Sequence, residues 1–265
     1  MFAASLPAQV VQPYLGKVLF GNGEVRNAFG LPASALLSGV QARDVLSLGC
    51  PPQGDGCLLE TPNRIISILG STVGWSAVAP SGGALFSWSE AGTPLVFFRK
   101  TSELFRWTGT QFELLPFAPQ GDVLALAPQV REGQLLYAIR QNGDTRIEAL
   151  ALASGSSRWI QSMGETGPVF LRSDGSVLTA GSDVTRLLLA DGSSKTFPRL
   201  QAISFFSMGG NLVEAVAPDG IWVIDGEQAL LLPGRENLRG TNPASVFDDI
   251  RRGRKRDRSL PEMGR

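Results

Sequence analysis

The side chains that most often carry out acid–base and metal chemistry at neutral pH are scarce in this chain. Histidine is absent from its 265 residues, and there are two cysteines. A Ser-His-Asp or Cys-His triad and the His-containing zinc sites all need an imidazole that the chain lacks. Two thiols also fall short of a four-thiolate metal site. We therefore predict no catalytic residue, no cofactor and no metal site from the sequence.

Carboxylates are the one chemistry that stays open. Glycosidases and lyases can use two carboxyl groups brought together from distant parts of a fold, so a histidine-free hydrolase or lyase is an alternative hypothesis. No single acid is marked for this role by its neighbours. The Asp-Gly pairs that begin at Asp174, Asp191, Asp219 and Asp225 lack the dense oxygen spacing of a calcium loop and are typical of tight turns.

The two cysteines lie close together in a loop-forming segment. Cys50 and Cys57 flank Pro-Pro-Gln-Gly-Asp-Gly, and six intervening residues allow the two Cα atoms to come within disulfide range. A redox-active pair would favour Cys-x-x-Cys near a βαβ pattern, which is absent. The segment favours a structural disulfide over two free thiols. A disulfide in turn indicates export, because reducing compartments do not maintain one.

Five tryptophans are the remaining candidates for ligand contacts. Trp75 and Trp222 fall near repeated turn motifs, where aromatic side chains usually pack in the core. Trp107 stands beside Arg106 and a Thr-Gly-Thr turn. We therefore predict Trp107 as the exposed aromatic residue available for binding.

The elements that must position these residues are short strands. Four segments share an apolar strand, a turn built on Pro, Asp or Gly, and a second apolar strand; they are 75–86, 123–139, 168–178 and 213–223. Their turns at Pro80, Pro128, Ser173 and Pro218 are separated, by residue number, by 48, 45 and 45 positions. A period near 45 residues matches one four-stranded blade of a β-propeller. No long segment has the 3.6-residue period of a helix.

The predicted fold is thus all-β, a small propeller of about five four-stranded antiparallel blades over residues 14–234. Strands near 16–20 and 25–29 would complete the sheet of the last repeat and close the ring, which removes exposed strand edges. Six blades are the alternative if 58–69 belongs to a shortened extra blade. Residues 235–265 hold a basic cluster with little apolar content and are predicted to be a disordered tail.

The repeated segments resemble the blades of β-propeller proteins, WD40-like in the broad sense. The best local match is Ala-Val-Ala-Pro-Asp-Gly-Ile-Trp-Val at 215–223, and the opening 23–32 is similar to uncharacterised exported propeller-like proteins of bacteria. The resemblance implies fold and compartment. It implies no activity, because propellers support both enzymes and binding scaffolds.

Charge and composition limit the partners. Lys plus Arg equals Asp plus Glu at 24 each, so no overall field attracts nucleic acid, and no run of eighteen apolar residues predicts a membrane span. We expect an extracytoplasmic scaffold that presents loops to a protein or carbohydrate partner, with a cytoplasmic location still open. The other hypotheses are the carboxylate-dependent enzyme and a structural domain of a larger envelope or secretion assembly. The sequence defines neither the partner nor the oligomeric state.

Overall fold

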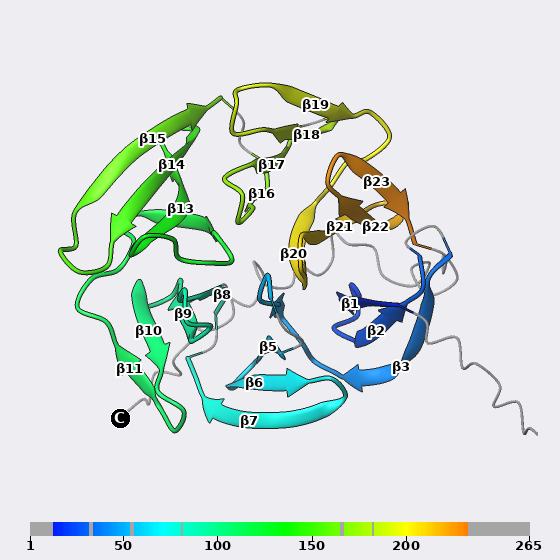
Figure 1. Cartoon of the computed structure of the whole chain (residues 1–265), viewed down its shortest axis with the longest axis horizontal. Helices are drawn as coiled ribbons and strands as arrows, with labels where there is room; N and C mark the ends of the chain where they lie inside the picture. The colour runs from blue at the N-terminus through cyan, green and yellow to red at the C-terminus, as the bar shows by residue number, and fades with distance from the viewer. Residues whose placement is uncertain are drawn as a thin grey trace, which may run out of the picture.

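A computed structural model describes residues 13–31, 34–53, 56–80, 82–164, 167–181 and 183–232, and these form a ring of six antiparallel sheets (Figure 1). The first sheet has three strands and the other five have four. The all-β propeller with antiparallel blades predicted from the sequence is confirmed. The blade count is six and not about five.

The strands follow one another from sheet to sheet in chain order. The first two sheets contain β1 (Tyr14–Leu19), β2 (Val25–Phe29) and β3 (Leu36–Ala42), then β4 (Ser47–Gly49), β5 (Gly56–Thr61), β6 (Arg64–Leu69) and β7 (Thr72–Val78). The third and fourth contain β8 (Ala84–Trp88), β9 (Pro94–Phe98), β10 (Glu103–Trp107) and β11 (Phe112–Leu114), then β12 (Asp122–Leu126), β13 (Gln134–Gln141), β14 (Asp144–Ala151) and β15 (Ser157–Met163). The fifth and sixth contain β16 (Val169–Leu171), β17 (Val177–Ala180), β18 (Thr185–Leu188) and β19 (Ser194–Phe197), then β20 (Ser204–Gly209), β21 (Leu212–Ala217), β22 (Gly220–Asp225) and β23 (Gln228–Leu231).

Local sequence explains the hairpins. Asn142 and Gly143 join β13 to β14 with φ values of 54° and 86°, the positive angles that a two-residue hairpin turn requires. β14 then alternates between buried and partly exposed positions over most of its length, as expected of a strand with one face against the core. The prediction of a tight Asn-Gly hairpin followed by a half-buried strand is confirmed.

The apolar core is divided into six parts, one at each junction between neighbouring sheets. Each cluster of buried side chains draws members from two adjacent sheets, including one cluster shared by the last and first sheets. That last cluster contains Val18 and Ala28 from the first sheet and Met208, Ile221 and Val223 from the sixth. The ring is therefore closed by apolar packing.

Ring closure differs from the prediction in one respect. The N-terminal strands do not complete the sheet of the last repeat, because β20 already supplies its innermost strand and β20–β23 is complete. The N-terminal strands form a separate sheet between β20–β23 and β4–β7. Residues 58–69 belong to β5 and β6 of a full four-stranded blade, which is the six-blade alternative without the shortening.

The first sheet, unlike the other five, contributes no strand to the cycle of innermost strands around the axis of the ring. Strands β4, β8, β12, β16 and β20 contact one another in a closed cycle, and β1 contacts β20 and β21. Five innermost strands therefore surround the axis. The three-stranded N-terminal sheet lies between the sixth and second sheets, outside these innermost strands.

Candidate binding pocket between the first and last sheets

The approach of β1 to β20 depends on a glycine. Gly16 has a φ of +138°, which side-chain-bearing residues rarely adopt. A Cβ at this position would collide with the backbone carbonyl oxygen of Met208. A glycine at position 16 thus allows the first sheet to lie directly against the last.

We expect Gly16→Ala to lower the free energy of unfolding by about 2–4 kcal/mol, because the new methyl group meets backbone and the φ angle becomes strained. Urea denaturation of the full chain measures the change. Gly21→Ala is the matched control, since nothing lies within 4 Å of a Cβ at Gly21. Equal stability of the two variants would show that β1 and β20 can separate at little cost.

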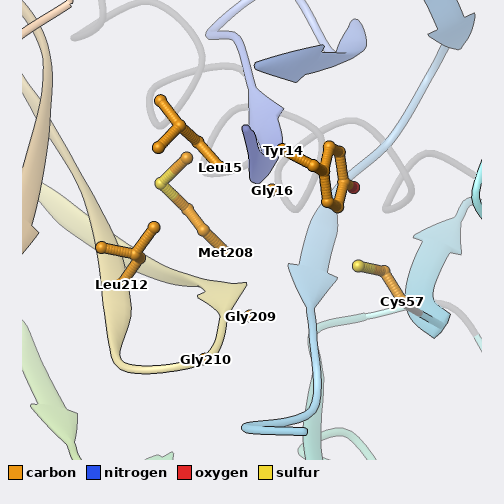
Figure 2. Close-up of a pocket in the computed structure, with 8 residues that line it drawn as sticks. All are labelled: Tyr14, Leu15, Gly16, Cys57, Met208, Gly209, Gly210 and Leu212. Carbon is orange, nitrogen blue, oxygen red and sulfur yellow. The ribbon is translucent and has the colours of Figure 1, made fainter. Parts of the chain in front are cut away.

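A pocket of about 180 Å³ opens beside this contact (Figure 2). Its walls come from the start of β1, the β20–β21 turn and the start of β5, namely Tyr14, Leu15, Gly16, Cys57, Met208, Gly209, Gly210 and Leu212. Figure 2 shows the side chains of Leu15, Met208 and Leu212 gathered on one side and Tyr14 on the other. We call this the β1–β20 pocket.

The walls of the pocket are apolar, apart from backbone and one phenol. Tyr14 is 41% exposed, and its ring centroid lies 5.6 Å from that of Phe29, which is opposite Tyr14 in the β1–β2 register. Met208, by contrast, is buried. The pocket can therefore receive an apolar group, with the Tyr14 ring at its edge.

Of the two cysteines, Cys57 lines this pocket. Cys50 and Cys57 are joined by a disulfide with an S–S distance of 2.01 Å, and both residues are buried. The backbone oxygen of Cys50 accepts a hydrogen bond from the Ser207 hydroxyl at 2.7 Å. This bond links the second sheet to β20 of the sixth sheet, next to the Cys57 wall.

A buried carboxyl group lies at the same junction. Glu214 on β21 is fully buried, and its Oε2 accepts a hydrogen bond from the backbone N–H of Leu19 at 2.9 Å. Its Oε1 has no hydrogen-bond partner in the described part of the chain. Burial raises the pKa of Glu214 well above the ordinary carboxyl value, against the smaller opposing effect of the bond from Leu19.

The prediction that Trp107 is exposed is wrong. Trp107 ends β10 and is buried, with its ring stacked on Trp75 at a centroid distance of 3.9 Å and an interplanar angle of 13°. Phe112 packs edge-on against it at 5.1 Å. The adjacent turn is exposed, but the strand directs the Trp107 side chain to the junction with the second sheet. Trp159 on β15, 61% exposed, is the accessible tryptophan that the sequence did not indicate.

The strands around the axis are mostly apolar. β4, β8, β12, β16 and β20 carry one charged residue among them, Asp122. Their half-buried positions include Leu85, Leu124, Phe170 and Phe205, each packed against an apolar cluster. These four side chains pack through apolar contacts, and none of them can donate or accept a proton.

The described ranges contain neither a cluster of metal-ligating side chains nor a membrane-spanning helix. Within them, no three His, Cys, Asp or Glu residues gather into a group that could hold a metal ion. The same ranges contain no helix with the length and apolar character needed to cross a bilayer. The predicted basic tail, residues 235–265, lies outside the described residues.

Comparison with known proteins supports the fold. No protein-family model and no curated protein sequence matches the chain. Among solved structures, a catalytically inactive virginiamycin B lyase from Staphylococcus aureus, crystallised with quinupristin, aligns over 88% of each chain with a TM-score of 0.50 and 12% identity. A chain of a nidogen/laminin complex aligns over 82% of this chain and 93% of that chain, with a TM-score of 0.56 and 11% identity. At this identity the likeness extends to the fold alone.

Proposed function

We propose that this propeller is a non-enzymatic scaffold that binds a protein partner through the β1–β20 pocket. The observation that carries the proposal is an apolar recess beside a partly exposed aromatic ring, Tyr14, at the junction of two blades. Buried apolar pockets that receive one anchoring side chain typically dominate the affinity of protein interfaces.

The size of the pocket supports a side chain over a free small molecule. Sites for drug-sized ligands measure about 300–1,000 Å³. The β1–β20 pocket, at about 180 Å³, is smaller and would take one large apolar side chain. A rigid ring of six sheets would hold this recess in place, so little conformational entropy is lost on binding.

The apolar innermost strands favour binding over chemistry. An enzyme that used carboxylates at the axis would need at least two acids in reach of one substrate. Asp122 is the one acid on the five innermost strands, and Glu214 is buried at a sheet junction. The alternative hypothesis of a structural domain in a larger envelope assembly also requires a bound protein partner. It differs from our proposal only in that the partner would stay bound permanently.

Photocrosslinking tests the proposal. We would replace Tyr14 with p-benzoylphenylalanine, an aromatic residue that keeps the contact with Phe29, and irradiate the protein with extract of its native host. We expect a discrete crosslinked protein, and Leu212→Glu should reduce its yield about tenfold or more by placing a charge in the pocket.

The control carries the same crosslinker at Leu114, which is 53% exposed on the outer strand β11. A product that forms equally from positions 14 and 114, or that survives Leu212→Glu, would contradict binding through the pocket. Circular dichroism of each variant, compared with the unmodified chain, ensures that a lost crosslink reflects a lost contact.

We further propose that the protein works outside the cytoplasm, which the Cys50–Cys57 disulfide supports. Protein taken from its native host, alkylated without reduction and digested with trypsin should yield one peptide that holds Cys50 and Cys57 in an internal disulfide, because no Lys or Arg lies between them; mass spectrometry should find it unalkylated and two hydrogens lighter than the reduced peptide. Reduction before alkylation is the control and should release both thiols. Recovery of both cysteines alkylated without reduction would contradict export.

A further inference from the structure

The exposed tryptophan lies on the outer rim of the fourth blade. The outermost strand of that sheet is β15 (Figure 1). Trp159 is on β15 and is 61% exposed. It lies opposite Glu148 on β14, so the two side chains share one face of the sheet. The indole Nε1 donates to the Ser162 hydroxyl at 3.4 Å, which turns the ring along the strand.

A second, independent feature lies beside it. Arg146 on β14 is opposite Ser162, on the same face as Glu148. Its Nε is shielded from water and has no hydrogen-bond partner in the described part of the chain. Arg26 and Arg172 have a shielded Nε of the same kind, so what distinguishes Arg146 is its place on the face that holds the exposed indole.

The carboxyl group of Glu148 is held in a fixed orientation. Its Oε2 accepts a hydrogen bond from the Tyr137 hydroxyl at 2.6 Å, and that hydroxyl also lies 3.0 Å from the Ser157 oxygen. Burial, with the bond to Glu148, raises the pKa of Tyr137 to about 12, so the phenol keeps its proton and remains a donor at neutral pH. One face of the blade thus carries an exposed aromatic ring, a carboxylate held in place and a half-buried guanidinium.

We propose that Trp159, Arg146 and Glu148 form a binding site for a neutral carbohydrate. A pyranose ring has a C–H face that would pack on the exposed indole, and its hydroxyl groups are both donors and acceptors. The terminal Nη groups of Arg146 would donate to one hydroxyl and the Glu148 carboxylate would accept from another. One positive and one negative group lie near the ring, so the site has no net charge, which favours a neutral over an anionic sugar.

This site is separate from the β1–β20 pocket. Its residues all come from the fourth sheet, whereas the pocket is formed by the first, second and sixth. The proposal therefore does not rest on protein binding at the pocket. A failed crosslink at Tyr14 leaves it unaffected.

Tryptophan fluorescence of the full chain tests the proposal. The other four tryptophans are buried or half-buried, so Trp159 gives the emission most accessible to acrylamide. The probes are cellohexaose, maltohexaose, mannohexaose and N-acetylchitohexaose, with oligogalacturonate as the anionic comparison. We expect at least one neutral oligosaccharide to shift the emission to shorter wavelength and to protect it from quenching.

Calorimetric titration of variants then assigns the contacts. Trp159→Ala should weaken binding of the active sugar about tenfold or more, and Arg146→Met, which keeps an apolar stem, about fivefold. Val73→Ala, at another exposed position on an outer strand, is the matched control and should bind normally. The proposal is overturned if none of the neutral sugars binds, if oligogalacturonate binds more tightly, or if Trp159→Ala binds as the unmodified chain does.

Discussion

Replacement of Glu60 by alanine is expected to lower the free energy of unfolding by about 2–4 kcal/mol. Glu60 is buried on β5, and its two oxygens accept hydrogen bonds from three successive backbone N–H groups in the connection to the third sheet. These come from Gly82 at 3.3 Å, Gly83 at 3.0 Å and Ala84 at 2.8 Å. The N–H of buried Ala84 has no access to water, so loss of its acceptor should account for most of the effect.

Urea denaturation of Glu60→Ala measures this loss, with Glu113→Ala as the control. Glu113 is half-exposed and pairs with Arg106 on the surface, so its removal should change stability by about 0.5 kcal/mol or less. Glu60→Gln should fall between the two, because one of its oxygens is kept. If Glu60→Ala matches Glu113→Ala, the three backbone bonds contribute little to the junction between the sheets.

Such polar links recur around the ring and complement the apolar clusters. The Arg99 guanidinium donates to the Leu124 backbone oxygen at 2.7 Å between the third and fourth sheets. Lys17, fully buried, donates to the backbone oxygen of Gly70 between the first and second sheets. A side-chain bond to the backbone of the next sheet fixes the angle between two sheets in a way that apolar packing cannot, because hydrogen bonds are directional.

The strands could be predicted from the sequence because their pattern is local. The Asn142-Gly143 hairpin and the alternation of β14 need information from about ten residues.

The predicted blade count was wrong because the turns chosen as repeats are not equivalent. Pro80 lies between two sheets, Pro128 follows an innermost strand, and Pro218 lies between the second and third strands of its sheet. The 45 residues from Pro128 to Ser173 do join equivalent turns, but they span the fourth sheet, whose β13 and β14 are the longest strands, so this spacing exceeds the length of the other blades.

The candidate sites depend on contacts between residues far apart in the chain. Trp107 was predicted to be exposed from its neighbouring turn, but Trp75, from another sheet, covers it. The β1–β20 pocket joins β1 to a turn more than 190 residues later. No feature of the sequence near Tyr14 identifies the β20–β21 turn as its partner. A glycine at the start of an N-terminal strand, Gly16, was the one local signal of a close approach.

The pH dependence of stability at the β1–β20 junction should depend on Glu214. Its pKa in the folded chain is raised well above the ordinary 4.5, whereas the unfolded chain should titrate near that value. Below pH 4.5 the carboxyl is protonated in both states, and its contribution to stability is complete. As pH rises above 4.5, the unfolded chain releases the proton while the folded chain retains it. Stability should therefore fall as pH rises, until the pH passes the folded pKa.

Glu214→Gln should remove this slope. The amide oxygen can still accept the bond from Leu19, and the side chain stays neutral at every pH. We expect the variant to match the unmodified chain near pH 4.5 and to be more stable at pH 8. Thermal melts across this range, compared at each pH, measure the difference. Asp174 and Asp191 have lowered pKa values, so their contribution to the stability of the protein is lost as pH falls, which is the opposite slope. Both aspartates are present in the variant and in the unmodified chain, so their effect cancels when the two proteins are compared at the same pH.

Glu214→Ala separates the charge from the hydrogen bond. It removes the titrating group but leaves the Leu19 N–H without an acceptor and opens a cavity, so it should cost about 2–4 kcal/mol at every pH. Loss of stability in both variants at pH 8 would contradict a carboxyl kept neutral by burial. It would show instead that ionised Glu214 stabilises the junction, with its charge met by a group that Gln cannot engage. A gain in Glu214→Gln and a loss in Glu214→Ala would show that a neutral side chain with its bond to Leu19, and not a charge, adds stability to the junction of the first and last sheets.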